Sequence, residues 1–279
     1  FDRITRPEQI IQSFQIAVQT MLDPADCGPA CISLSQDIQG QTFDYPAEFF
    51  QEKVHTIRRP RPDEFQIKEA ADKIKSSKNP IIISGGGVFY SDAMEELSQF
   101  AIKHNIPVTQ TVMGYSTMKR DHSHFAGQIG GLGGKNTNTL AKETDLAIAV
   151  GTKLADFTTG SWANFENENF KLVSINVSRY DANKHLAQAV VGDAKVSLTE
   201  LSQALGDWKV GEDWNKKSQI ELKSWNEHID KESAPTNQEV PSYVQAIGAI
   251  YRNSDPTDIA VTAAGGLVGE VIQVWRPRE

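Results

Sequence analysis

The sequence predicts an α/β fold: a central doubly wound parallel sheet, flanked at both ends by partial α/β domains. Within residues 63–207, short apolar segments alternate with segments whose apolar residues recur every three or four positions, as strands and helices do in such a fold. The short segments are apolar throughout rather than at alternate positions, which is typical of strands buried on both faces. Polar or proline-punctuated segments separate this region from its neighbours.

Composition along the chain divides it into five parts. Residues 1–50 are expected to be the end of one α/β domain, and 51–62 a linker that contains the run Arg58-Arg59-Pro60-Arg61-Pro62. The central α/β domain follows at 63–207. We expect a helical linker at 208–239 and the start of a third α/β unit at 240–279.

The clearest unit of the central region lies at residues 79–109. Three isoleucines after Pro80 make a short buried strand, and Gly85-Gly86-Gly87 allow a sharp turn after it. Ser91 is expected to cap the next helix, which runs to His104 with one apolar stripe. The next strand then begins near Ile106, so the unit is strand, helix, strand.

The remaining elements of the central region repeat this alternation. In order they are a helix from Asp63, the strand 106–111, the helix 137–143, the strands 146–150, 171–177 and 189–191, and the helix 194–205. A glycine-rich stretch, Gly127–Gly134, precedes the second helix.

Each end of the chain shows only part of an α/β domain. Thr5 and Glu8 have the spacing of a helix capping box, and a strand is expected at 28–35. Near the other end, a helix at 243–251 precedes an expected strand at 258–262. One helix and one strand cannot bury their own apolar faces, so we expect the missing strands to lie outside this sequence.

Charge and composition exclude several classes of function. The 279 residues carry a formal net charge of −8, which argues against nucleic acid or an anionic membrane surface as the main partner. No apolar run approaches the roughly 20 residues that cross a bilayer, so we expect no membrane and a cytoplasmic location. Cys27 and Cys31 fit neither a redox pair nor half of a zinc site, and we expect two buried thiols.

Two glycine-containing turns follow strand ends, where open parallel sheets place their ligands. Gly85-Gly86-Gly87 lacks the third glycine of the dinucleotide fingerprint, because Tyr90 stands there. A structural tight turn, classical NAD binding and another nucleotide or phosphate site all remain open. Gly127–Gly134 and Gly151–Gly160 could together line a crevice at this edge, or could be two ordered loops.

The sequence lacks the common motifs for hydrolysis. It has no Gly-x-Ser-x-Gly elbow, no His-Glu-x-x-His and no Walker lysine. His122 and His124 flank Ser123 in a polar turn, and without a supporting cluster of ligands we expect no metal there.

Longer runs of the chain resemble thiamine-diphosphate enzymes, and the resemblance covers essentially the whole sequence. The order of parts is the same, and the stretch 124–156, with Gly130-Gly131-Leu132-Gly133 and Gly151-Thr152-Lys153, resembles the middle domain of acetolactate-synthase-type members. The runs that resemble the branch acting in inositol catabolism are 2–9, 32–37, 175–179, 193–196 and 235–240.

The resemblance implies that residues 1–50 end a pyrimidine-binding domain and 240–279 begin a diphosphate-binding domain. For the intact protein it implies thiamine diphosphate and Mg²⁺ as cofactors, and hydrolysis of a carbon–carbon bond that opens a cyclic polyol-dione to a 5-deoxy-glucuronate. It places the catalytic residues and the magnesium ligands outside this sequence, so it assigns no catalytic or metal residue within it.

One loop of this chain is implied to contact the cofactor. Small residues there let the main chain come close to a ligand, although a plain helix-entry loop is the alternative. The implied cofactor-binding residues are Ala264, Gly265, Gly266, Leu267 and Gly269.

In flavin-containing relatives, the residues matching Gly151-Thr152-Lys153 and Thr159-Gly160 line an FAD site. Lys153 replaces the arginine common there, which argues against FAD in this protein. Two other functions remain open, an acetolactate-synthase-type carboligase and a nucleotide-binding regulatory module built on residues 63–207.

The sequence begins at Phe1 rather than at a methionine, so we expect it to be a piece of a longer polypeptide that is inactive by itself. Active sites of the resembled family form between two subunits. We therefore expect a homodimer or homotetramer of the intact protein.

Overall fold

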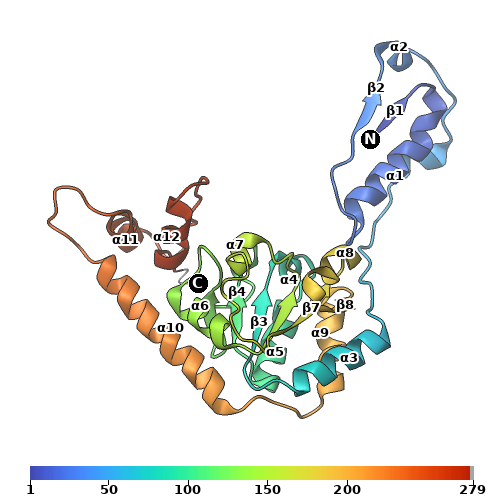
Figure 1. The fold of residues 1–279 in the computed structure, drawn as a ribbon. Helices are drawn as coiled ribbons and strands as arrows, with labels where there is room; N and C mark the ends of the chain where they lie inside the picture. Colours follow the sequence, from blue (N-terminus) through green and yellow to red (C-terminus); the bar gives the residue numbers. More distant parts are fainter. Residues whose placement is uncertain (277–279) are drawn as a thin grey trace. The chain divides into compact units, whose positions relative to one another are not determined.

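The computed structural model describes residues 1–276 (Figure 1). Contacts between residues divide the chain into two compact units, Phe1–Pro60 and Arg61–Glu279. The division falls inside the segment 51–62, where a charged, proline-containing sequence favours neither helix nor strand.

The first unit is a small α/β arrangement. Strand β1 (Asp2–Ile4) pairs in parallel with β2 (Ile32–Leu34), and α1 (Ile10–Leu22) connects them. Its shorter elements are the 3₁₀ turns η1 (Pro7–Gln9) and η2 (Ala47–Phe50) and the helix α2 (Gln36–Gln39).

Three expectations for this unit were wrong in detail. Helix α1 starts later than the capping box implied, because Pro7–Gln9 form a 3₁₀ turn, and the Thr5 amide donates to Oε1 of Gln9 instead of pairing with Glu8. The strand β2 is shorter than 28–35. Cys27 and Cys31 are free and exposed rather than buried, since the small sheet leaves them uncovered.

The second unit contains a six-stranded parallel sheet, which confirms the predicted fold class. Its strand order is β5-β4-β3-β6-β7-β8. The two halves therefore diverge from β3 and β6, and this is the topological switch point where doubly wound sheets usually bind ligands. The strands are β3 (Pro80–Ser84), β4 (Val108–Gln110), β5 (Phe125–Gln128), β6 (Leu146–Val150), β7 (Lys171–Asn176) and β8 (Gln188–Val191).

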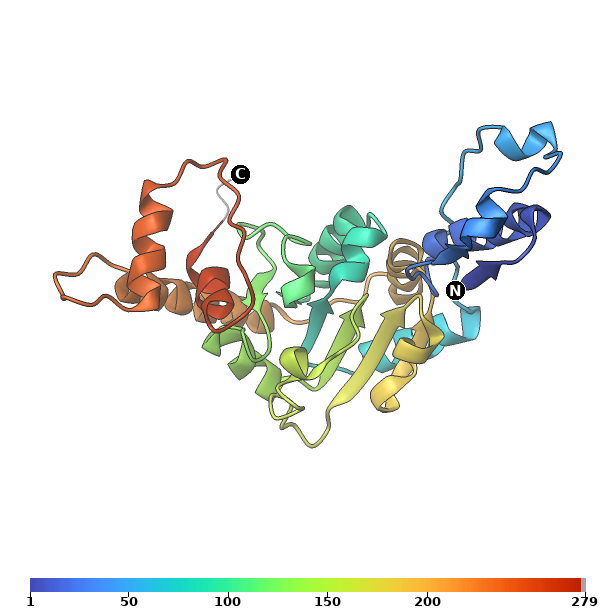
Figure 2. The ribbon, with the colours of Figure 1, turned by 90° about the horizontal axis from the view of Figure 1, so that it is seen from above.

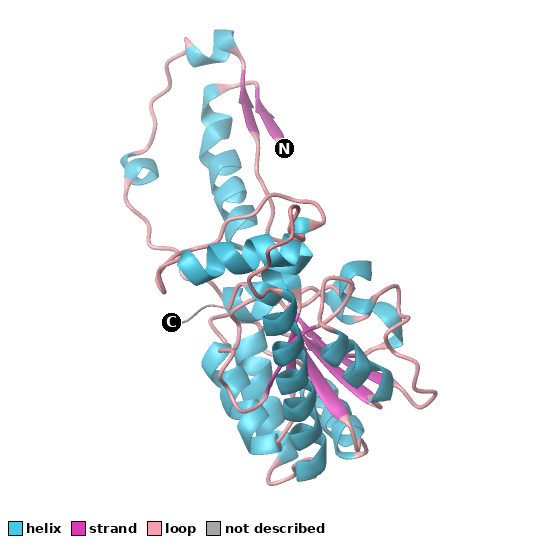
Figure 3. Ribbon diagram, turned by 90° about the vertical axis from the view of Figure 1, so that its left-hand side faces the viewer, coloured by secondary structure: helices cyan, strands magenta, loops and turns pink. Residues whose placement is uncertain are grey.

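Helices cover both faces of this sheet (Figure 3). Every residue of β3 and β6 is buried, although successive side chains of a strand point to opposite faces. The covering helices and turns are α3 (Glu64–Lys75), α4 (Gly86–Tyr90), α5 (Met94–His104), η3 (Val112–Gly114), α6 (Lys135–Glu143), α7 (Asp156–Thr159), α8 (Arg179–Ala182), η4 (Lys184–Leu186), α9 (Ala194–Leu205) and α10 (Glu212–Glu232).

Two features of the central region differ from expectation. The strand β5 was not predicted, because its glycine and glutamine residues hide it in a glycine-rich stretch. Ser91 does not cap α5, whose N-cap residue is Ala93: the glycine turn opens directly into α4, and the Ser91 hydroxyl donates to Asp193 and accepts from the amide of Ala194 at the start of α9.

The last part of the second unit packs two helices on α10. These are α11 (Tyr243–Asn253) and α12 (Leu267–Val274), which lie near the end of α10 (Figure 2). Ile229, Ile247 and Val274 form a small core among the three helices. The expected strand at 258–262 is wrong: the segment has no regular structure, and Ile259 and Val261 are 87% and 90% exposed. An isolated strand needs a neighbour for its hydrogen bonds, and no strand among residues 1–276 pairs with it.

No helix within residues 1–276 combines the length and apolar character needed to span a bilayer.

Candidate functional site

The carboxyl ends of the six parallel strands meet at one edge of the sheet. The turn Gly85–Gly87 after β3 and the turn that begins at Gly151 after β6 also lie at this edge. Main-chain hydrogen bonds continue past the strands at this edge. The amide of Gly85 donates to the carbonyl of Val150 over 2.9 Å, and the amide of Gly151 donates to Ile175 over 2.9 Å. The turns therefore extend the sheet instead of opening away from it.

At the switch point itself the two turns touch. The amide of Gly87 donates to the carbonyl of Gly151 over 2.9 Å, and a Cβ added at Gly87 would stand 2.6 Å from the Cα of Gly151. Main chain thus fills the place where a dinucleotide-binding sheet leaves a crevice. Of the interpretations left open by the sequence, the geometry favours a structural tight turn for Gly85–Gly87.

Close main-chain packing also holds the glycine-rich loop after β5. Gly130 has φ +103°, and a Cβ there would lie 2.0 Å from the carbonyl oxygen of Phe157. The amide of Gly131 donates to that oxygen over 2.7 Å, and the side chain of Asn138 bonds both the amide and the carbonyl of Gly130. These glycines allow close packing of this loop on α7, which leaves only its outer part, Gly131–Gly133, beside open space.

That open space is a cleft of about 520 Å³ on the second unit. It brings the loop after β5 together with part of the cofactor loop implied by the sequence, Gly266 and Gly269. Its other walls come from α10, the start of α11, and α12. The lining residues are Gly131, Leu132, Gly133, Trp225, His228, Ile229, Glu232, Ser242, Val244, Gly266, Gly269, Glu270, Gln273 and Val274.

The five cofactor-loop residues have different surroundings. Ala264, Gly265 and Gly266 are exposed, and no atom lies within 4 Å of a Cβ added at either glycine. Leu267 is 43% exposed at the first position of α12. Gly269 faces Leu132, whose Cδ2 would lie 3.2 Å from an added Cβ. The loop therefore leaves its main chain accessible to a ligand, while Gly269 allows α12 to approach the central domain.

Several polar groups of the cleft were not singled out from the sequence. One face of α10 presents Trp225, then the neighbours His228 and Ile229, then Glu232. This repeat of three to four positions is visible in the sequence but also fits an ordinary packed helix. The Oε2 atom of Glu270 is buried and has no hydrogen-bond partner among residues 1–276. The cleft thus combines an aromatic wall with carboxylates.

Three histidines, His104, His122 and His124, are buried or half-buried near the amino-terminal ends of β4 and β5, away from the cleft. His124 is hydrogen-bonded to Asn105 and Ser123, each over 3.0 Å, and burial lowers its pKa to about 4, with a smaller contribution from His122. Burial also lowers the pKa of His122 and of His104. Among residues 1–276, no three side chains of histidine, cysteine, aspartate or glutamate are arranged to hold a metal ion.

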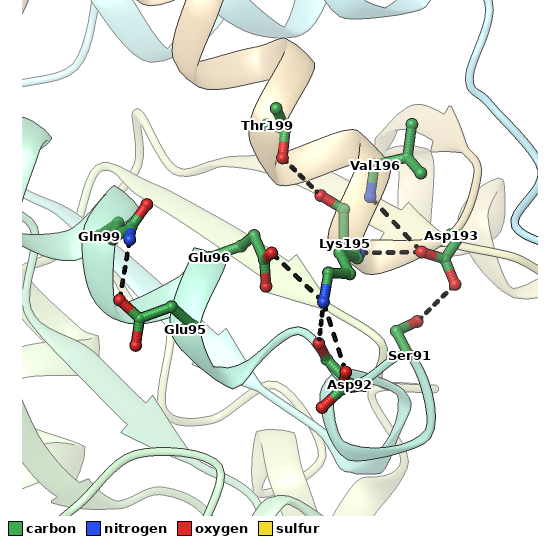
Figure 4. Close-up of polar contacts among 9 residues, drawn as sticks. All are labelled: Ser91, Asp92, Glu95, Glu96, Gln99, Asp193, Lys195, Val196 and Thr199. Carbon is green, nitrogen blue, oxygen red and sulfur yellow. Dashed lines mark hydrogen bonds and ion pairs between the residues drawn. The ribbon is translucent and has the colours of Figure 1, made fainter.

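A further polar cluster joins the start of α9 to the turn after α4 (Figure 4). Asp193 accepts from the amide of Lys195 over 3.0 Å and from the hydroxyl of Ser91 over 2.7 Å. The ammonium of Lys195 pairs with Asp92 and Glu96, each over 3.4 Å. These contacts fix one helix on another, so the cluster is structural.

Known proteins resemble the whole chain. It is 36% identical over 298 residues to 3D-(3,5/4)-trihydroxycyclohexane-1,2-dione hydrolase of Clostridium perfringens, covering 99% of this chain and 47% of that protein. The proteins of the same name from Bacillus licheniformis and Halalkalibacterium halodurans are each 37% identical, over 301 and 298 residues, again with 99% of this chain and 47% of the relative covered. The chain thus spans about half the length of these curated relatives.

A family model covers the centre of the chain. It describes the central domain of thiamine pyrophosphate enzymes and matches residues 67–201. The matched segment begins in α3, ends in α9 and contains the complete six-stranded sheet. Residues 67–201 therefore match the family of thiamine pyrophosphate enzyme central domains.

Proposed function

We propose that this chain is part of a thiamine-diphosphate-dependent hydrolase that opens the ring of trihydroxycyclohexane-1,2-dione in inositol catabolism, giving a 5-deoxy-glucuronate. The observation that carries the proposal is the match along 99% of the chain to a hydrolase named for this substrate. It includes the regions before and after the central domain, and so is more specific than the fold.

The described residues fit one part of a thiamine diphosphate site. The exposed main chain of Ala264–Gly266 and the open space beside Gly265 and Gly266 suit close approach of a ligand. Among residues 1–276, no group of three or more histidine, cysteine, aspartate or glutamate side chains is arranged to hold a metal ion. We therefore assign to this chain a supporting contact with the cofactor, and propose that magnesium is bound by residues outside positions 1–276.

Bound thiamine diphosphate supplies an electron sink for breaking a carbon–carbon bond. The contribution of this chain is to bind and to orient. The central sheet holds the loop that contains Gly131–Gly133, and α12 carries the exposed loop toward the same cleft. Rigid placement of the loops around a reacting group is itself a source of rate acceleration.

The remaining expectations belong to the same proposal. We propose a cytoplasmic homodimer or homotetramer with a small cyclic polyol-dione as substrate and with active sites shared between subunits. FAD has no role in the proposed reaction, and the isolated chain is expected to be inactive.

The test uses the longer protein that contains this chain, stripped of cofactor by dialysis. We expect release of a ring-opened acid from trihydroxycyclohexane-1,2-dione, followed by nuclear magnetic resonance, only after thiamine diphosphate and Mg²⁺ are added. Turnover without thiamine diphosphate would contradict the proposal. Conversion of pyruvate to a ketol, with no reaction of the dione, would show a carboligase instead.

A further inference from the structure

The side chain of Gln273 links α12 to two other parts of the second unit. It is 9% exposed. Its Oε1 accepts from the indole Nε1 of Trp225 over 2.8 Å, and its Nε2 donates to the carbonyl of Leu132 over 2.9 Å. An indole N–H only donates and a carbonyl only accepts, so these partners fix the orientation of the amide.

Each partner belongs to a different wall of the cleft. Trp225 lies on α10, and Leu132 is in the outer part of the loop after β5. The Leu132 side chain also faces Gly269 on the first turn of α12. A single amide thus joins the wall that belongs to the central domain with the helix that carries the exposed loop.

Two further contacts hold the carboxyl end of α12, where Gln273 also lies. The hydroxyl of Tyr115 donates to the carbonyl of Trp275 over 3.0 Å, and Arg120 donates to the carbonyl of Ile272 over 3.5 Å. Loss of the Gln273 contacts would therefore leave α12 anchored at its carboxyl end. The carbonyl of Leu132 would lose its partner on α12, so the loop Gly131–Gly133 would become free to move relative to α12 and the loop 264–266 that it carries.

We propose that Gln273 is a positioning residue, which sets the distance between the exposed loop 264–266 and the glycine loop 131–133 at which the cleft accepts its cofactor. This inference rests on the proposed function for the identity of that ligand. It assigns no chemistry to Gln273, which acts through Leu132 and Trp225.

The first experiment replaces Gln273 with methionine, which keeps the length and burial of the side chain and removes both hydrogen bonds. Gln203→Met on the exposed surface of α9 is the matched control. In the longer protein we expect Gln273→Met to raise the apparent Kd of thiamine diphosphate by about three- to tenfold, as loss of one or two hydrogen bonds implies. With saturating cofactor, kcat should stay within about twofold of the control, because the reacting groups are untouched. A Kd equal to that of the control would overturn the inference.

The second experiment uses Gln273→Glu, whose function should depend on pH. A neutral carboxylic acid can accept from Trp225 and donate to Leu132 as the amide does, whereas a carboxylate loses the donor and faces a carbonyl oxygen. Burial raises the pKa of such a carboxyl above its usual value of about 4.3. We expect cofactor affinity close to wild type at low pH and close to that of Gln273→Met above neutrality. Wild-type affinity at both extremes would contradict the proposed role.

A third measurement separates failure of this inference from failure of the proposed function. If the wild-type protein turns over without thiamine diphosphate, the proposed function fails. Deuterium exchange of peptides over 129–134 and 264–270 then tests Gln273 alone. Faster exchange in Gln273→Met than in Gln203→Met supports the positioning role, and equal exchange refutes it.

Discussion

The amide of Gly87 donates to the carbonyl oxygen of Gly151 over 2.9 Å, and this bond closes the central sheet at its switch point. Gly87 follows β3 and Gly151 follows β6, the two strands from which the halves of the sheet diverge. The contact requires that neither residue carries a Cβ. A position that often opens toward a nucleotide is here part of the packed body of the domain.

Replacing Gly87 with alanine should destabilise the central domain. The new Cβ would stand 2.6 Å from the Cα of Gly151, so the two turns must separate and break their hydrogen bond. We expect the free energy of unfolding, measured with urea, to fall by about 2–4 kcal/mol. Gly131→Ala is the control, because its Cβ would meet atoms only at 3.8 Å and beyond. Equal effects of the two substitutions would show that the contact carries little stability.

The Asp193 carboxylate should contribute more stability than an ordinary helix cap. It accepts from the amides of Lys195 and Val196 and from the buried hydroxyl of Ser91. We expect Asp193→Ala to cost about 2–3 kcal/mol in urea denaturation, because buried donors lose their acceptor. Asp63→Ala removes a cap that accepts from the amide of Phe65, and should cost about 1 kcal/mol. A smaller effect at Asp193 than at Asp63 would contradict this role.

Stability should decrease when the pH falls below about 6.5. His124 has a pKa of about 4 in the folded chain, so between these two values the unfolded chain binds a proton that the folded chain does not. The loss attributable to this group reaches on the order of 3 kcal/mol by pH 4. In His124→Gln the free energy of unfolding should fall less steeply as the pH is lowered, but it should still fall, because His104 and His122 remain. The glutamine amide can still donate to Asn105, so the substitution keeps this hydrogen bond. An unchanged pH profile in that variant would show that His124 is not the source.

Most of the central domain could be predicted from the sequence because its strands are continuously apolar. The segment Leu146–Val150 contains no polar residue, and the observed β6 has the expected bounds. Strand β5 escaped prediction because Gly127 and Gln128 have little strand propensity, and tertiary contacts with β4 override that preference. The strand expected at 258–262 has the right local pattern, but no neighbour among the described residues supplies its hydrogen bonds.

The candidate site was predictable only in part. The loop 264–269 was predicted from the family resemblance, and its alanine and glycines are compatible with close approach of a ligand or with a plain helix-entry loop. Trp225 and Gln273 are 48 positions apart, and only the packing of α12 on α10 brings them together. Likewise, the glycines that suggested a nucleotide crevice serve main-chain packing, which spacing alone does not distinguish from ligand binding.

The central claim is that ligand chemistry lies at the loop 264–269 and not at the closed switch point. Deuterium exchange of the longer protein, with and without thiamine diphosphate, tests it most directly. We predict protection of peptides over 264–270 and unchanged exchange over 85–88 and 151–153. Protection of 85–88 or 151–153 by NAD, FAD or ADP, with none at 264–270 on adding thiamine diphosphate, would contradict it.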